Sequence, residues 1–141
     1  MTRLQKLSKA VYALIDSDIF SESDKQFLID QLATGLYDII DIAISVTNTP
    51  EDINAAIDRL KRNGPAEMEN IFISIHKNLD SYRSRIIQEY FYVEFIDAIL
   101  DVCSYDEVAE LGAILDSIGV DTDLCNEVRT EYKKELQRAQ S

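Results

Sequence analysis

Residues that break regular structure are rare in this chain. Its 141 residues include only two prolines and four glycines. Most of these lie between stretches in which apolar residues recur every three or four positions, the spacing of one helix face. The sequence therefore predicts an all-α fold, a compact bundle of about seven or eight helices. One acidic domain over residues 1–141 is expected, because a chain of roughly 100–200 residues usually closes around one core.

The first predicted helix begins with a capping signal. Thr2 and Gln5 have the spacing of a capping box, in which each side chain bonds the backbone N–H of the other residue. A helix should therefore begin after Thr2, and we expect it to end near Ser17. Its apolar residues share one face: Leu4, Leu7, Val11, Leu14 and Ile15.

A second helix should follow after a short loop. Ser21 with Asp24 three residues later can cap its start, and Gly35 can end it in the left-handed conformation. The residues expected to face inward are Phe27, Leu28 and Leu32. Together the two helices form a predicted hairpin.

The middle of the chain leaves alternatives open. From residue 42 onward the segment 36–46 alternates apolar and polar side chains, as a strand would, although we expect a helix there. Pro50 and Pro65 each suit the first position of a helix, so two further helices should begin at them. The helix after Pro65 also has a strand as its alternative, because isoleucines alternate over residues 71–75.

The third quarter of the chain contains the longest predicted helix. No residue from Ser81 to Cys103 breaks a helix. A stripe at spacings of three and four is expected to face the core: Ile87, Phe91, Phe95, Ala98 and Val102. Ser104 and Glu107 form another capping box, Gly119 should end the helix that this box begins, and Asp121 should cap a last one.

The two predicted hairpins resemble each other. In the first, Gly35 follows the capping serine by 14 residues, and in the second Gly119 follows its capping serine by 15. Each half consists of an apolar helix, a short loop, a capped helix and a glycine. We expect two pseudo-repeated hairpins, with chance similarity between amphipathic helices as the alternative.

Several classes of protein do not fit this sequence. No stretch approaches the roughly 20 apolar residues of a membrane helix, and residues 1–6 lack the apolar core of a signal peptide. We therefore expect a cytoplasmic protein without membrane insertion. Cys103 and Cys125 are 22 positions apart with only His76 to join them, so neither a zinc module nor a disulfide framework is supported. Both cysteines should be buried apolar residues.

Acidic residues dominate the charge of the chain. It has 26 Asp and Glu against 14 Lys and Arg, a formal charge of −12. Between Ile86 and Val128 there are 11 acidic residues and no Lys or Arg. Direct binding to a nucleic acid is not expected, because such binding depends on positive charge. A basic protein surface is the expected partner.

A stripe of carboxylates on the predicted central helix is the candidate binding face. Glu94, Asp97 and Asp101 follow at i, i+3 and i+7, with Tyr90 one turn earlier. Without a cationic neighbour, carboxylates at this spacing repel each other by a few tenths of a kcal/mol per pair. Successive turns place them about 5 Å apart along the helix, so the stripe imitates a row of nucleic-acid phosphates. The predicted partner-binding residues are Tyr90, Glu94, Asp97, Asp101, Asp106, Glu107 and Glu110. A merely solvated surface is the alternative.

A divalent cation is a second candidate ligand, and no other cofactor is expected. Four acids crowd the first predicted interhelical loop, and oxygen ligands suit calcium or magnesium: Asp16, Asp18, Glu22 and Asp24. The loop lacks the glycine of an EF-hand, and Phe27 occupies the twelfth position, where that motif has Glu. The alternative is an ordinary helix start, where the dipole favours acids.

Residues suited to catalysis are scarce. His76 is the single histidine, and neither a glycine-rich phosphate loop nor a Gly-x-Ser-x-Gly turn occurs. We expect no enzyme. Scattered carboxylates acting with a metal are the remaining enzymatic alternative.

Two segments resemble TerB-like (tellurite-resistance) proteins. Residues 15–26 are similar to the first repeat of that family, with an apolar helix, an acidic loop, a Ser and an acidic helix start; Ile19 stands where the family has glycine. Residues 111–120 are similar to the closing segment of the family, an apolar helix that ends in Leu-Gly-Leu/Ile. The resemblance covers roughly residues 9–35 and 93–128.

The resemblance implies a compact bundle of seven or eight helices and a role in stress or phage-response complexes, often near membranes. It also implies acidic patches that hold divalent cations. The positions that match the acidic motifs of the family are Asp18, Glu22, Asp24, Asp106 and Glu107.

Two functions follow from these features. The first is a non-enzymatic acidic protein-binding module that resembles TerB-like stress-response proteins and acts through a carboxylate-rich helical face. The alternative is a phage- or plasmid-encoded inhibitor or immunity protein that mimics nucleic-acid charge and blocks a basic target protein. A homodimer contact through Tyr37, Tyr90 and Tyr92 is left open beside core packing, because aromatic residues are enriched in both.

Overall fold

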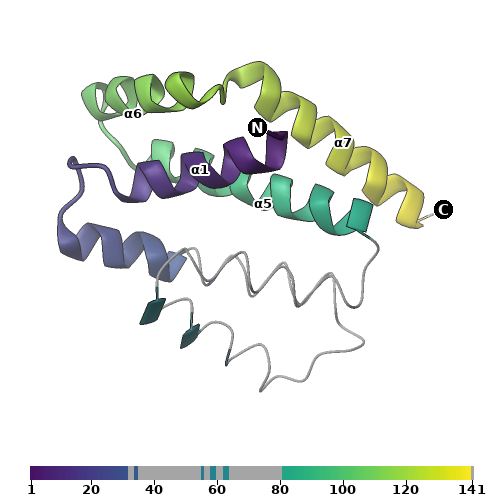
Figure 1. The fold of residues 1–141 in the computed structure, drawn as a ribbon, viewed down its shortest axis with the longest axis horizontal. Coiled ribbons are helices and arrows are strands. Elements are labelled where there is room, and N and C mark those ends of the chain that lie inside the picture. The colour runs from purple at the N-terminus through teal and green to yellow at the C-terminus, as the bar shows by residue number, and fades with distance from the viewer. Residues whose placement is uncertain (32–33, 35–54, 56–57, 60–61, 64–80, 141) are drawn as a thin grey trace.

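The structure, a computed structural model, describes residues 1–31, 34, 55, 58–59, 62–63 and 81–140 (Figure 1). Its helices are α1 (Arg3–Ile15), a helix over residues 22–31, α5 (Ser81–Asp101), α6 (Tyr105–Ile118) and α7 (Thr122–Gln140). These ranges contain no strand, so the all-α prediction is confirmed for them. No helix within the same ranges is both long and apolar enough to cross a membrane.

Capping boxes begin α1 and α6, as the sequence predicts. The Gln5 N–H donates to Thr2 Oγ1 at 3.1 Å, and the Thr2 N–H donates to Gln5 Oε1 at 2.9 Å. Ser104 and Glu107 make the same pair of bonds, at 3.3 and 2.8 Å. Each box satisfies backbone donors that the first turn of a helix leaves unpaired.

The helix over residues 22–31 is capped by Ser21 and Asp24, as predicted: the Asp24 N–H donates to Ser21 Oγ at 3.1 Å. Leu28 faces the core and is 5% exposed. The prediction that Phe27 also faces inward is wrong, since this side chain is 56% exposed. Adjacent residues of a helix point about 100° apart, so this helix buries one of the two and not the other.

α5 lies at the centre of the described helices. It runs in the same direction as α1 and opposite to α7, and both pack against it (Figure 1). Phe91 and Phe95 are buried as predicted, and Ile87 is half-buried. The predicted inward positions of Ala98 and Val102 are wrong: Ala98 is exposed, and Val102 is 70% exposed just after the helix ends.

The physical reason is that α5 is covered on two sides. A helix packed against two neighbours buries a wide arc rather than one narrow stripe. The buried arc of α5 therefore includes residues outside the predicted stripe: Ile86, Gln88, Glu89, Tyr92, Val93, Ile96 and Ile99. One of these residues, Glu89, is central to the charge network described below.

The connection from α6 to α7 also follows the prediction. Gly119 has φ 93°, the left-handed conformation, and its N–H donates to Leu115 O and Asp116 O, both at 3.1 Å. Asp121 Oδ1 then accepts from the Leu124 N–H at 2.8 Å and begins α7. Glycine suits position 119 because it has no Cβ to clash in the left-handed conformation.

Several predictions lie outside the described residues. These are the helices expected over 36–46 and after Pro50 and Pro65, and the positions of Leu32 and Gly35. Within the second of these helices, residues 55, 58, 59, 62 and 63 are described and are helical. The count of seven or eight helices and the pseudo-repeat stay predictions. Cys103 and Cys125 are free thiols and are half-buried rather than fully buried.

Candidate functional site

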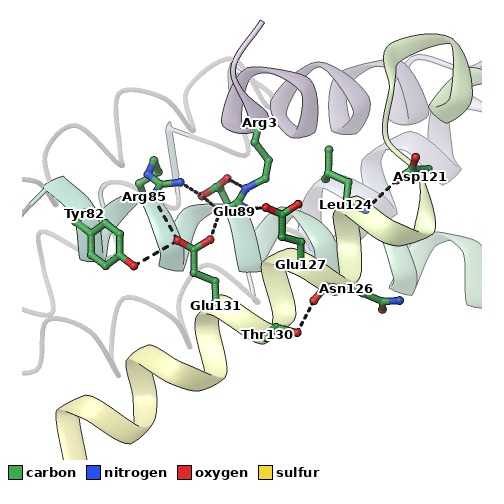
Figure 2. Close-up of polar contacts among 10 residues, drawn as sticks. All are labelled: Arg3, Tyr82, Arg85, Glu89, Asp121, Leu124, Asn126, Glu127, Thr130 and Glu131. Carbon is green, nitrogen blue, oxygen red and sulfur yellow. Dashed lines mark hydrogen bonds and ion pairs between the residues drawn. The ribbon is translucent and has the colours of Figure 1, made fainter.

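Arg3 lies at the centre of a charge network that joins α1, α5 and α7 (Figure 2). Its Nε donates to Glu89 Oε2 at 2.5 Å, and its Nη2 donates to Glu89 Oε1 at 3.1 Å. Nη2 also donates to Glu131, and Nη1 lies 3.1 Å from Glu127 Oε1. The Glu89 side chain has no exposed surface, so this carboxylate lies wholly inside the protein.

Arg85 completes the network from the same side of α5. Its Nη1 donates to Glu89 Oε1 at 2.7 Å, and its Nη2 lies 3.5 Å from Glu131 Oε1. The Tyr82 hydroxyl donates to the same Glu131 oxygen at 3.4 Å, and Arg85 lies over the Tyr82 ring at 5.4 Å (Figure 2). Three carboxylates therefore share two guanidinium groups.

The electrostatics of the network favour the charged forms of its members. The hydrogen bond to Glu89 raises the pKa of Arg3 above the usual arginine value, although burial acts against it. Burial alone would raise the pKa of Glu131, but the hydrogen bond and charge of Arg3, with the charge of Arg85, lower it below the usual value. These groups hold three helices together and, paired in this way, are poorly suited to proton transfer.

Sequence reasoning missed this network, for a clear reason. Arg85 and Glu89 are four positions apart on a helix, and so are Glu127 and Glu131, a spacing that signals contact on one helix face. Arg3, which joins them, is 86 positions from Glu89. Nothing local to the sequence links these two residues.

The first half of the predicted partner-binding face turns toward α7. Arg129 of α7 donates to Asp97, and its Nε lies 4.0 Å from Glu94 Oε1. Tyr90 stacks on Tyr132 of α7, with ring centroids 3.8 Å apart. Burial, followed by the charge and hydrogen bond of Glu94, raises the pKa of Tyr90.

The stripe thus has the cationic neighbour that the acidic run lacks along the sequence. The run without Lys or Arg ends at Val128, and Arg129 is the next residue. Because α7 lies antiparallel to α5, Arg129 folds back onto the carboxylates of the stripe (Figure 1). Arg129 therefore offsets one of the two negative charges of Glu94 and Asp97 within the protein.

The second half of the predicted face lies where α5 ends and α6 begins. Asp101, Asp106 and Glu110 are exposed, and their carboxylates have no hydrogen bond or ion pair within the described ranges. Glu107 differs, because it closes the capping box of α6. Between these acids two large apolar side chains face solvent: Val102, 70% exposed, and Tyr105, 89% exposed. We call Asp101, Val102, Tyr105, Asp106 and Glu110 the acidic end.

The four predicted metal ligands lie in the loop after α1 and at the start of the next helix. Asp16 and Asp18 are exposed, Asp24 bonds the Ser21 N–H at 3.4 Å, and Glu22 lies 3.8 Å from Lys25 Nζ. Among the described residues, no group of three or more His, Cys, Asp or Glu is close enough to hold a metal ion. The structure does not bring these four acids together as one ligand set.

This loop nevertheless lies at the same end of the molecule as the acidic end (Figure 1). α1 and α5 run in the same direction, so the loops that follow them lie at the same end of the molecule.

Comparison with known proteins adds no assignment: no family model, no curated protein and no solved structure matches the chain.

Proposed function

We propose that the chain is a non-enzymatic protein-binding module that binds a basic protein surface through the acidic end. One observation carries this proposal: the carboxylates of Asp101, Asp106 and Glu110 are exposed and unpaired within the described ranges, and two exposed apolar side chains, Val102 and Tyr105, lie between Asp101 and Asp106 in the sequence. By contrast, Glu94 and Asp97 are paired with Arg129. The part of the stripe available to a partner is therefore the Asp101 side.

The chemistry of the acidic end suits a basic partner that also carries apolar groups. Carboxylates around a contact accelerate the approach of a basic protein and exclude acidic ones. Tyrosine at the centre of a contact contributes much of the binding energy, because a large apolar area is buried with little loss of rotamer freedom. Tyr105 and Val102 would supply that centre, and the acids its rim.

The resemblance to TerB-like proteins supports one form of this proposal, an accessory module of a stress-response complex. That form includes the seven or eight helices, the pseudo-repeated hairpins and a divalent cation in the first acidic loop, where the candidate ligands are Asp16, Asp18, Glu22 and Asp24. The other form is an inhibitor that mimics nucleic-acid charge. A melt of chelator-treated protein with calcium, magnesium or manganese separates them, because a ligand bound to the native state raises the melting temperature. A rise abolished by Asp18→Asn with Glu22→Gln favours the TerB-like form, and no rise favours the inhibitor.

Binding to two synthetic peptides tests the acidic end itself. In one peptide arginine alternates with leucine, and in the reference arginine alternates with serine. We expect the Asp101→Lys, Asp106→Lys variant to bind the first peptide more weakly by about tenfold or more. We expect Tyr105→Ser to lose the preference for the leucine peptide while retaining binding to the serine peptide.

A matched control is available in the same helices. Asp116 lies in the last turn of α6, as Asp101 does in α5, and Asp123 lies in the first turn of α7, as Asp106 does in α6. The Asp116→Lys, Asp123→Lys variant therefore has the same charge and similar helix-dipole effects. Equal losses in the two double variants would show general charge attraction and overturn the acidic end as the binding site.

A further inference from the structure

Gly112 lies in the middle of α6, where glycine makes a helix less stable than alanine does. Its backbone does not need glycine, because the only described residue with positive φ is Gly119. Its surroundings do not need glycine either, since a Cβ built at Gly112 has no neighbouring atom within 4 Å. What lies beside Gly112 is open space.

This space is a pocket of about 300 Å³ between α5, α6 and α7. Its floor is apolar and includes Ile96, Leu115 and Val120, each no more than 7% exposed. The volume is at the lower end of the range of about 300–1,000 Å³ typical of small-molecule pockets. Glycine in the wall allows a ligand to approach the α6 backbone closely.

The rim of the pocket is charged. It includes Asp97, Asp116, Asp121 and Arg129. Arg129 is paired with Asp97, so these two charges offset each other. Asp116 has an exposed carboxylate with no ion pair among the described residues, and Asp121 uses one oxygen to cap α7. Two negative charges are therefore left beside an apolar floor.

We infer that this pocket binds a small aliphatic amine of the diamine or polyamine class. The methylene chain would lie on the apolar floor beside Gly112, and an ammonium group would lie near Asp116 and Asp121. An apolar floor with a few convergent polar groups is typical of small-molecule sites. This site is separate from the acidic end, so it stands or falls independently of the proposed function.

Calorimetric titration with cadaverine tests the site, with pentanediol as the neutral ligand of similar length. We expect binding of cadaverine and not of pentanediol. Gly112→Leu should fill the pocket. Asp116→Asn with Asp121→Asn should remove its charge, while the amide oxygen introduced at position 121 keeps the helix cap. Each change should weaken cadaverine binding by about tenfold or more. Circular dichroism melts verify that each variant is folded.

The control for general attraction to an acidic protein is Asp30→Asn with Asp58→Asn, which removes the same charge from two residues that neither line the pocket nor belong to the acidic end. This variant should bind cadaverine within about twofold of the unmodified protein. Equal weakening in both double variants, or unchanged binding in Gly112→Leu, would overturn the proposed site.

The two free thiols give a second measurement that does not depend on a variant. Cys125 lines the pocket, whereas Cys103 does not. Burial raises the pKa of both thiols, so both should react slowly with iodoacetamide. Saturating cadaverine should slow alkylation of Cys125 and leave Cys103 unchanged, as measured by peptide mass spectrometry. Equal effects on the two cysteines, or none, would contradict binding in this pocket.

Discussion

Glu89 shows how a single residue can be buried and charged in this protein. A carboxylate removed from water is destabilised by several kcal/mol unless charged hydrogen bonds replace the lost solvent. Here Arg3 supplies two such bonds and Arg85 a third. The three bonds explain why Glu89 lies among apolar side chains on the inner side of α5.

Breaking this arrangement should therefore be costly. We expect Arg3→Met or Glu89→Gln to lower the free energy of unfolding by about 2–4 kcal/mol, because each leaves a charged partner without its counterpart. The double variant should lose clearly less than the sum of the two, since its second change removes a group already unpaired. Urea denaturation measures all three. Lys9→Met, an exposed change on the same helix, should stay within about 0.5 kcal/mol. Additive losses would contradict a direct coupling.

Glu131 makes a pH-dependent contribution to stability. Its pKa is lower in the folded protein than its ordinary value of 4.5, so folding favours the ionised form. The stabilisation is fully present above about pH 4.5 and is lost as the pH falls through the lower, folded-state pKa. We expect Glu131→Gln to be less stable than the unmodified protein at pH 7, with the difference shrinking toward pH 3. Urea titrations of both proteins between pH 7 and pH 3 measure this difference, and a difference that stays constant over that range would contradict the contribution of Glu131.

Sequence reasoning succeeds at this scale where partners are close along the chain. The bonds between Thr2 and Gln5 are predictable because three positions bring a side chain to the backbone of its own first turn. The pairing of Arg129 with Asp97 spans 32 positions and depends on how α7 lies on α5. Four of the seven predicted binding residues keep an available side chain: Asp101, Asp106, Glu110 and, in part, Glu94.

At the scale of the element, two glycines have opposite roles in α6: Gly112 lies within the helix, and Gly119 caps its end. Gly119 ends the helix in the left-handed conformation, which destabilises other residues. A Cβ at position 119 would lie 3.5 Å from Lys6 Nζ, which is an ordinary contact. Glycine is therefore required there by the backbone conformation alone. Gly112 has neither constraint.

Replacing each glycine by alanine should therefore change the free energy of unfolding in opposite directions. Gly119→Ala should lower the free energy of unfolding by about 1 kcal/mol, because Ala disfavours positive φ. Gly112→Ala should raise it by about 0.5–1 kcal/mol through better helix propensity. Both changes add one methyl group, in the middle of α6 or at its C-cap, so each is the control for the other in chemical denaturation. A loss of stability at both positions would mean that Gly112 is constrained in some way that its open surroundings do not show.

Helix boundaries are the best-predicted feature of these elements, and buried faces the least. Capping residues fix where α1, α6 and α7 begin, whatever packs on them. Which residues of α5 are buried depends on how many neighbours it has. Among the described helices, both α1 and α7 pack against α5; Tyr92 and Val93 are buried outside the predicted stripe, while Val102 lies beyond the helix end. The spacing of apolar residues in the sequence does not indicate how many helices pack against α5.

At the scale of the whole molecule, the charge of −12 is unevenly compensated. Arg3, Arg85 and Arg129 offset acids on α5 and α7. The acidic end and the loop after α1 keep theirs, and they lie at one end of the bundle (Figure 1). A surplus of like charge destabilises a compact state through repulsion. The internal pairs and the repulsion therefore act in opposite directions on stability.

Salt should separate these two contributions. The screening length falls from about 30 Å at 0.01 M to about 10 Å at 0.1 M, so added sodium chloride weakens long-range repulsion more than the partly buried pairs around Glu89. We expect the melting temperature to rise over this range. Neutralising Asp101→Asn, Asp106→Asn and Glu110→Gln changes the charge from −12 to −9 and should make the rise smaller. A melting temperature that falls with salt would instead show that exposed ion pairs outweigh repulsion, and the unpaired carboxylates of the acidic end would then impose little strain for a basic partner to relieve.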